Sequence, residues 1–144
     1  MPRRSDALIP LSHGHHKALY LAKLIKDSDD PVAARRAFTE FWDEHGIEHF
    51  RSEEEVLLPL SGLPGPSADA DVARMLDEHL DIRRRATAVL AGEATLDEMK
   101  QLGSNLFDHV RFEERELFPR IEAQLDEEQM RVLAAAIEDT PGTC

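Results

Sequence analysis

The hydrophobic positions of the chain recur with helical spacing along almost its whole length. Apolar residues return every three or four positions in each long segment, and no stretch keeps the period of two that marks a β-strand. The pattern predicts four long helices and a short amphipathic tail helix, over about 12–26, 32–58, 67–90, 95–119 and 126–138. The fold class is therefore all-α: an antiparallel up-down-up-down four-helix bundle with a short C-terminal helix, because short connections make consecutive helices antiparallel neighbours.

Local signals mark the ends of these helices. Ser12 can cap the first helix, and Thr95 with Glu98 three residues later forms a capping box for the fourth. Residues 59–66, rich in proline and glycine, are the clearest break in the chain. Pro119 is expected to end the fourth helix, since proline lacks the backbone N–H that a continuing helix needs.

Composition places the chain in one broad class. Its 144 residues fit a single domain over 1–144, with a core bundle over about 8–120 and the tail helix over about 126–138. The net charge of −12 repels a nucleic-acid backbone or an anionic membrane, and no apolar run approaches the roughly 18 residues that span a bilayer. The single Cys144 excludes a disulfide framework and a CxxC motif. We expect a cytoplasmic protein without a nucleic-acid or membrane partner.

Two segments 60 residues apart are closely similar. Residues 49–59 align without gaps on residues 109–119, and six of the eleven positions are identical: His, Arg, Glu, Glu, Leu and Pro. His15 and His79 repeat with a similar offset of 64. The chain therefore reads as two helical hairpins, each contributing one histidine and then a His-x-x-x-Glu motif.

The repeated polar residues lie on the apolar faces of their predicted helices. Spacing i, i+4 places both ends of His-x-x-x-Glu on one face. Burying two carboxylates without compensating charge costs several kcal/mol each, and no lysine or arginine shares these inward stripes. In an up-down bundle, the relevant ends of the four helices lie on one side. At 1.5 Å of rise per residue, six residues lie within about 5–15 Å of that side and can converge on one site. They are His15, His49, Glu53, His79, His109 and Glu113.

Four imidazoles and two carboxylates are a donor set for a pair of divalent or trivalent first-row metals. The two glutamates would bridge the metals, and each metal would keep an open position. Zinc and manganese accept the same donors, so the residues alone leave the metal open.

These residues resemble the haemerythrin-like (HHE cation-binding) domain family over roughly residues 8–120. The resemblance rests on His15, on His49-x-x-x-Glu53 with its trailing Leu-x-Pro, on Glu78-His79, and on His109-x-x-x-Glu113 before Leu-Phe-Pro. It implies two iron ions in a carboxylate-bridged centre. It also implies binding of dioxygen, nitric oxide or a similar diatomic ligand, for sensing, storage or scavenging.

The chain departs from the oxygen carriers of that family. Their third helix supplies two histidines four apart, whereas Met75 and Arg83 flank His79 at that spacing here. Their fourth helix ends in a His-x4-Asp pair, whereas after His109 here the +4 residue is Glu113 and the +5 residue is Glu114. His45, one turn before His49, is the candidate for an additional ligand; the alternative is a supporting or simply buried histidine.

Other polar and aromatic residues have less specific interpretations. His15 shares a stripe with apolar residues, whereas the stripe of His16 soon meets Lys23 and Asp27, so His15 is preferred to His16 as the ligand. His13 is expected to be solvated or to cap the helix. Tyr20 and Trp42 are expected in the core. The remaining charged candidates are expected on solvated faces: Glu54, Glu55, Glu114, Glu116 and residues 83–85. For Glu54 and Glu114, the alternative is that they support a histidine ligand.

Three functions fit these features, and we favour the first. It is a non-enzymatic di-iron binding protein. A di-iron peroxidase- or oxidase-like enzyme is the second, with Tyr20 or His45 as candidate proton donor, and a metal storage or transport protein is the third. The Glu-x-x-His motif of ferritin-like bundles and the His-Glu-x-x-His motif of zinc proteases are both absent.

Overall fold

The computed structural model describes residues 4–139, and all regular structure within them is helical. Cys144, the single cysteine, lies outside the described residues. The all-α fold class is confirmed. Five rods follow one another: α1 (Ile9–Asp27); a composite of α2 (Pro31–Phe41), η1 (Trp42–Gly46), α3 (Ile47–Ser52), η2 (Glu53–Leu57) and α4 (Leu58–Leu60); α5 (Ala70–Leu90); a composite of α6 (Leu96–Phe112), η3 (Glu113–Leu117) and α7 (Phe118–Gln124); and α8 (Glu127–Glu138). The η segments are π-helical.

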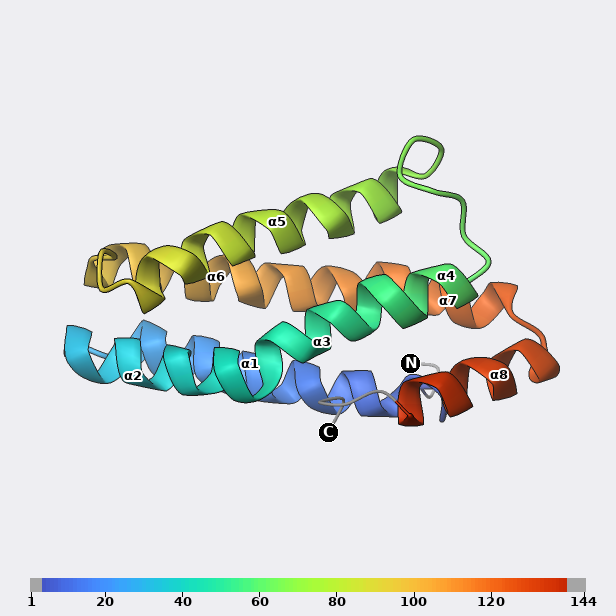
Figure 1. The fold of residues 1–144 in the computed structure, drawn as a ribbon, viewed down its shortest axis with the longest axis horizontal. Helices are drawn as coiled ribbons and strands as arrows, with labels where there is room; N and C mark the ends of the chain where they lie inside the picture. The colour runs from blue at the N-terminus through green and yellow to red at the C-terminus, as the bar shows by residue number, and fades with distance from the viewer. Residues whose placement is uncertain (1–3, 140–144) are drawn as a thin grey trace.

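The first four rods form the bundle. The α1 and α6 helices share the most extensive contact, α1 also packs on α2, and α5 packs on both α6 and α2. The short connections after α1 and α5 lie at one end, and the longer connection from α4 to α5 lies at the other (Figure 1). Helix α8 packs across η2 and α4 near that second end (Figure 1).

Side-chain caps begin the helices where turn residues predict them. Thr95 and Glu98 form the predicted capping box, and Asp126 forms a second one with Gln129. Asp69 accepts hydrogen bonds from two backbone N–H groups at the start of α5. Gly92 ends α5 with a φ of 75°, a left-handed conformation that glycine adopts without strain.

Two predicted helix ends are wrong. The α1 helix begins at Ile9, because Pro10 suits a first turn, and Ser12 is buried inside the helix instead of capping it. The fourth rod does not stop at Pro119 but continues to Gln124. There the π-helical turn η3 precedes the proline, so Pro119 falls in the first turn of α7, where its missing N–H is tolerated.

The core consists of two apolar clusters with a polar layer between them. One cluster gathers Phe38, Trp42, Ile82 and Leu106 toward the short connections. The other gathers side chains from η2, α5, η3, α7 and α8, among them Leu57 and Leu117. Along each bundle rod, the inward histidines and glutamates lie between residues of the first cluster and residues of the second.

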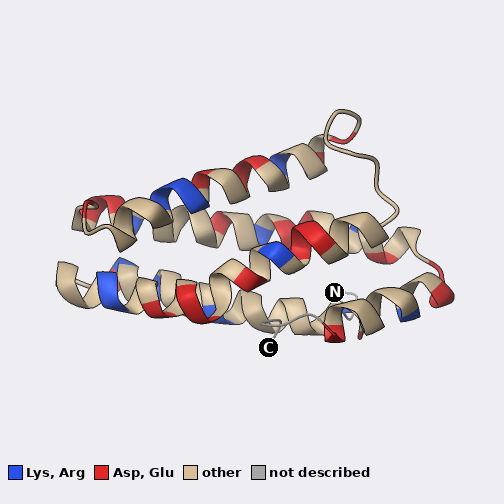
Figure 2. Cartoon of the chain, in the orientation of Figure 1, with Lys and Arg blue, Asp and Glu red and all other residues tan. Residues whose placement is uncertain are grey.

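Charged residues occur in every part of the bundle. Acidic residues are distributed along most of its length, with basic residues between them (Figure 2). Within residues 4–139, no helix has both the length and the apolar character that crossing a bilayer requires.

Candidate metal centre

The structure brings together all six residues that the repeat predicts. Each is buried, and both glutamates have no exposed surface. They form two groups that share both glutamates, and within each group one ligand atom per residue lies within 4.8 Å of the others. The first group adds His15 and His49, and the second adds His79 and His109.

The glutamates span the two groups with different oxygen atoms. Oε2 of Glu53 lies 3.3 Å from Nε2 of both His15 and His49, while its Oε1 lies 3.0 Å from Nε2 of His79. Oε1 of Glu113 lies 2.7 Å from Nε2 of His15, and its Oε2 lies 3.1 Å from Nε2 of His109. Each carboxylate therefore has the orientation of a bridge between two cations.

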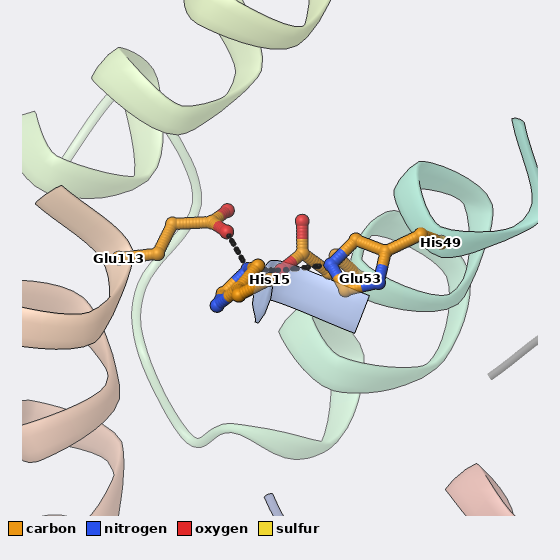
Figure 3. A group of neighbouring side chains, drawn as sticks. All are labelled: His15, His49, Glu53 and Glu113. Carbon is orange, nitrogen blue, oxygen red and sulfur yellow. Dashed lines mark hydrogen bonds and ion pairs between the residues drawn. The ribbon is translucent and has the colours of Figure 1, made fainter. Parts of the chain in front are cut away.

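Figure 3 shows how the first group assembles from three rods. Glu113 reaches from the α6–α7 rod toward His15 of α1, and His49 and Glu53 approach from the opposite rod. No single helix carries more than two of the six residues. The bundle topology is therefore what creates the cluster.

The unpartnered atoms of the cluster fit a pair of metal ions. Among residues 4–139, nine buried side-chain nitrogen and oxygen atoms have no hydrogen-bond partner, and seven of them belong to this cluster. Such an atom costs about 1–3 kcal/mol when nothing satisfies it. Six of the seven are a histidine Nε2 or a glutamate oxygen, the donors that first-row metals bind.

Three of the four imidazoles have a carboxylate on their outer nitrogen. Nδ1 of His15 donates to Glu114 at 2.5 Å, Nδ1 of His79 donates to Glu54 at 2.6 Å, and Nδ1 of His109 donates to Glu78 at 2.8 Å. With a metal on the inner side, this arrangement would keep the ring proton on Nδ1, leave Nε2 to bind the metal and raise the basicity of Nε2. The expectation that Glu54 and Glu114 are simply solvated is wrong.

The repeat itself carried the signal for two of these partners. In each repeat a Glu-Glu doublet places one carboxylate between the groups and the next on the outer nitrogen of a histidine from another rod. Glu53 and Glu54 do so with His79, and Glu113 and Glu114 do so with His15. The second glutamate of the doublet is among the six identical positions of the alignment.

Arg83 extends this network and is not merely solvated. Its guanidinium donates to Oε2 of Glu54 at 2.7 Å and lies 5.5 Å from the centre of the Phe50 ring. Arg84 and Arg85 instead pair with Asp81 of their own helix. Of the three consecutive arginines, only Arg83 therefore contacts the carboxylates around the cluster.

His49 is the exception among the imidazoles, and Gly14 is the reason. Both ring nitrogens of His49 lack a hydrogen-bond partner in the described chain. Glu78, which supports His109, directly precedes His79. The equivalent position before His15 is Gly14, so His49 has no corresponding carboxylate. A Cβ on Gly14 would collide with Nδ1 of His49 and lie 2.8 Å from its Cε1.

Aromatic rings hold two of the imidazoles in place. The ring of Phe50 stacks on His79 with centroids 3.9 Å apart and an angle of 2° between planes. The ring of Phe118 stacks on His15 at 5.2 Å and 25°. Each stack restricts rotation of the imidazole, so Nε2 keeps its direction toward the glutamates.

Within the cluster, the histidines and the glutamates shift each other's pKa values in opposite directions. Burial by itself lowers the pKa of His79, but the facing carboxylates of Glu113 and Glu53 raise it well above its ordinary value. Burial and the neighbouring Glu113 raise the pKa of Glu53, but His49 and His15 outweigh them and hold it at about 2. Burial also raises the pKa of Glu113, but His109 and His15 outweigh it and hold this pKa well below its ordinary value. Both glutamates are therefore anionic and available to cations.

Two of the three π-helical segments begin at the glutamates that both groups share. Segments η2 and η3 begin at Glu53 and Glu113, the same position of the repeat, and the backbone carbonyl of each glutamate accepts from the N–H five residues later. Segment η1 contains His45. Single π turns of this kind insert an extra residue into a helix and redirect its side chains.

His45 stands apart from both groups. Its side chain is 30% exposed, and Nε2 lies 3.9 Å from a carboxylate oxygen of Glu44 on the outer surface. It does line a small hollow beside the first group, whose walls include Gly14, His49 and Leu106. The hollow has a volume of about 10 Å³, room for about one water-sized molecule.

The remaining predicted positions divide between core and surface. His13 and His16 are both exposed, which agrees with the choice of His15 over His16, and Trp42 is buried in the first apolar cluster. Tyr20 is 73% exposed, so its predicted place in the core is wrong. Its helical stripe faces outward, whereas the buried stripe of α1 runs through His15, Ala18 and Ala22.

Comparison with known proteins gives one family. The model described as Hemerythrin HHE cation binding domain matches residues 6–121. A protein named DNA nickase from Nostoc sp. (strain PCC 7120 / SAG 25.82 / UTEX 2576) is 29% identical over 119 residues, which cover 80% of this chain. Those residues cover 33% of the Nostoc protein, so the chain spans about a third of its length. No solved structure matches the chain.

Proposed function

Because the chain belongs to the hemerythrin HHE cation-binding domain family, we propose that its buried cluster holds two iron ions and binds a diatomic ligand such as dioxygen or nitric oxide. The observation that supports a dinuclear centre is the pair of fully buried glutamates whose separate oxygens face two groups of imidazoles. When bound, an iron pair would supply open coordination positions for a small ligand.

The residues of the chain have distinct parts in this proposal. His15 and His49 would hold one ion, His79 and His109 the other, and Glu53 with Glu113 both. Glu54, Glu78 and Glu114 would orient three of the imidazoles through Nδ1. A role for His45 as a further ligand is not part of the proposal, since its ring nitrogens lie outside both groups.

The hollow beside His49 supports a very small ligand. Its apolar walls include Phe41, Leu106 and Val110, and its volume of about 10 Å³ accepts about one water-sized molecule. Apolar walls favour an uncharged molecule of that size. His49, without a carboxylate on Nδ1, faces this hollow and leaves one side of the first group less constrained.

A peroxidase- or oxidase-like enzyme is the second candidate, and the position of His45 favours it. Its imidazole is both partly exposed and part of the wall of the hollow, so it can pass a proton between solvent and a ligand held there. The alternative donor Tyr20 lines a different groove. A nickase activity is not part of the proposal, because this chain covers a third of that relative and its net charge of −12 repels DNA.

Metal analysis combined with absorption spectra of anaerobically purified protein tests these proposals. Two iron ions per chain and a visible band that appears with oxygen and disappears on its removal support the binding function. Steady consumption of hydrogen peroxide supports the enzyme instead. Bound metal without any spectral response to oxygen or nitric oxide would contradict both and indicate metal storage.

A further inference from the structure

A surface groove separate from the metal centre lies between α1 and α6. Its volume is about 660 Å³, and none of its lining residues belongs to the six of the centre. Gly103 is part of the lining. The two helices are in contact there, since a Cβ on Gly103 would lie 3.5 Å from the carbonyl oxygen of Ala22. The tyrosine that the core does not use, Tyr20, forms one wall.

The groove exposes apolar and aromatic surface. Tyr20 is 73% exposed and Phe107 is 38% exposed, and Leu19 lies between the groove and the first apolar cluster. Large aromatic rings left in water at a concave surface give up favourable burial energy. A ligand with an apolar body would recover it.

The groove also concentrates the lysines of an acidic protein. The chain has four lysines, and three of them line the groove: Lys23, Lys26 and Lys100. None of the three has an ion pair with a carboxylate anywhere in residues 4–139, and the lining contains only one acidic residue, Asp27. In a chain with a net charge of −12, this is a local positive potential.

The size of the groove favours a small molecule over a protein partner. Small-molecule sites have volumes of roughly 300–1,000 Å³, and 660 Å³ falls within that range. A stable protein interface needs roughly 20–30 residues on each side, whereas ten residues line this groove. We propose that the groove between α1 and α6 binds an anionic amphiphile, a small molecule with an apolar or aromatic body and a carboxylate, sulfonate or phosphate group that the three lysines face.

Two matched probes separate the apolar part of this proposal from the charged part. The anion 8-anilinonaphthalene-1-sulfonate and the uncharged N-phenyl-1-naphthylamine share one aromatic body, and both fluoresce when it is buried. The 144-residue chain, loaded with metal, should bind the sulfonate at least fivefold more tightly than the neutral probe. Equal affinity for the two probes, or no binding of either, would overturn the proposal.

Three variants locate the binding. Lys23→Gln combined with Lys100→Gln should weaken sulfonate binding at least fivefold and change binding of the neutral probe less than twofold. Ser104→Trp, at an exposed position of the lining, should fill the groove and weaken both probes at least tenfold. Lys17→Gln, the lysine outside the groove, is the matched control and should leave both affinities within twofold.

Circular dichroism of each variant verifies the helical fold before titration. If the lysine pair and Ser104→Trp change neither affinity, the probes bind elsewhere and the proposal is wrong. Decanoate and decyl phosphate serve as competitors: displacement by one identifies the headgroup, and displacement by neither overturns the proposal. An acidic amphipathic helical peptide that displaces the sulfonate and binds tenfold more tightly would assign the groove to a protein partner instead.

Discussion

The Nδ1 atom of His79 lies 2.6 Å from Oε2 of Glu54, a residue that the sequence pattern places beside the bridging position and not on it. Glu54 therefore holds His79 from outside while Glu53 faces it from inside, at 3.0 Å from Nε2. One turn of backbone thus supplies both the inner and the outer carboxylate of the same imidazole. Glu113 and Glu114 do the same for His15.

Replacing Glu54 should weaken metal binding without unfolding the bundle. Glu54→Gln keeps the size of the side chain but removes the charge that orients His79 and raises its basicity. We expect metal affinity to fall about 10–100-fold, measured by competition with a chelator of known affinity. Glu55→Gln is the matched control, because Glu55 is exposed and pairs with Arg51. Equal affinity in the two variants would refute the supporting role.

Removing either of the two carboxylates shared by both groups should reduce the number of bound metals. Glu53→Ala and Glu113→Ala each delete oxygens that face both groups, so elemental analysis should find one metal or none per chain. His79→Ala should have a weaker effect, because it touches one group only. Two metals per chain in both glutamate variants would contradict the bridging assignment.

Gly14 and Gly103 form a pair of helix glycines with opposite expected behaviour. Alanine favours a helix interior over glycine by about 1 kcal/mol. At Gly103 the new Cβ would make ordinary contact with Ala22, so stability should stay the same or rise by up to about 1 kcal/mol. At Gly14 it would displace the ring of His49, so Gly14→Ala should lower metal content. Urea unfolding and metal analysis of both variants test this; full metal content in Gly14→Ala would show that His49 is not a ligand.

Metal removal should destabilise the fold. The metals would bind only the assembled cluster, so their binding energy adds to folding, about 2.7 kcal/mol per site at a hundredfold excess over Kd. Loss of both metals should therefore cost about 5 kcal/mol and lower the melting temperature by roughly 15–20 °C. A variant carrying both Glu53→Ala and Glu113→Ala should melt at the same temperature with and without chelator. Unchanged melting of the unmodified protein after complete metal removal would contradict the expected coupling.

The connection between the two hairpins should be sensitive to acid through Asp69. Two hydrogen bonds from Arg120, at 2.7 and 3.0 Å, together with the α5 cap, hold the pKa of Asp69 at about 2. Because this pKa lies below its ordinary value near 3.9, the ion pair stabilises the fold above about pH 4 and is lost as the pH falls toward 2.

Two substitutions separate the cap from the charge. Asp69→Asn keeps a capping oxygen, so its deficit against the unmodified protein should be constant from pH 7 to 5 and shrink below pH 4. Asp69→Ala also loses the cap and should cost about 1 kcal/mol more at pH 7. Urea unfolding across this pH range measures both, and a deficit of Asp69→Asn that persists undiminished at pH 2.5 would exclude the charge as its cause.

Two predictions from the sequence are wrong for different physical reasons. Pro119 is a valid stop signal for an α-helix, but the π turn before it changes which N–H groups must bond, and no pattern of apolar residues reports that change. Tyr20 was expected in the core on its aromatic character, whereas the direction of its side chain puts it in the groove with Lys23.

The sequence by itself determined the helices, their inward faces and the six clustered residues, because helical periodicity and the 60-residue repeat can be read along the chain without knowing how the helices pack. Only the tertiary structure decided which glutamate meets which histidine. Glu54 and His79 are 25 residues apart, and Glu114 and His15 are 99 apart, so their pairing depends on the packing and rotation of separate rods. The groove between α1 and α6 likewise exists only where two helices far apart in sequence approach at a glycine. Periodicity sets which face of a helix is buried, and packing sets what that face meets.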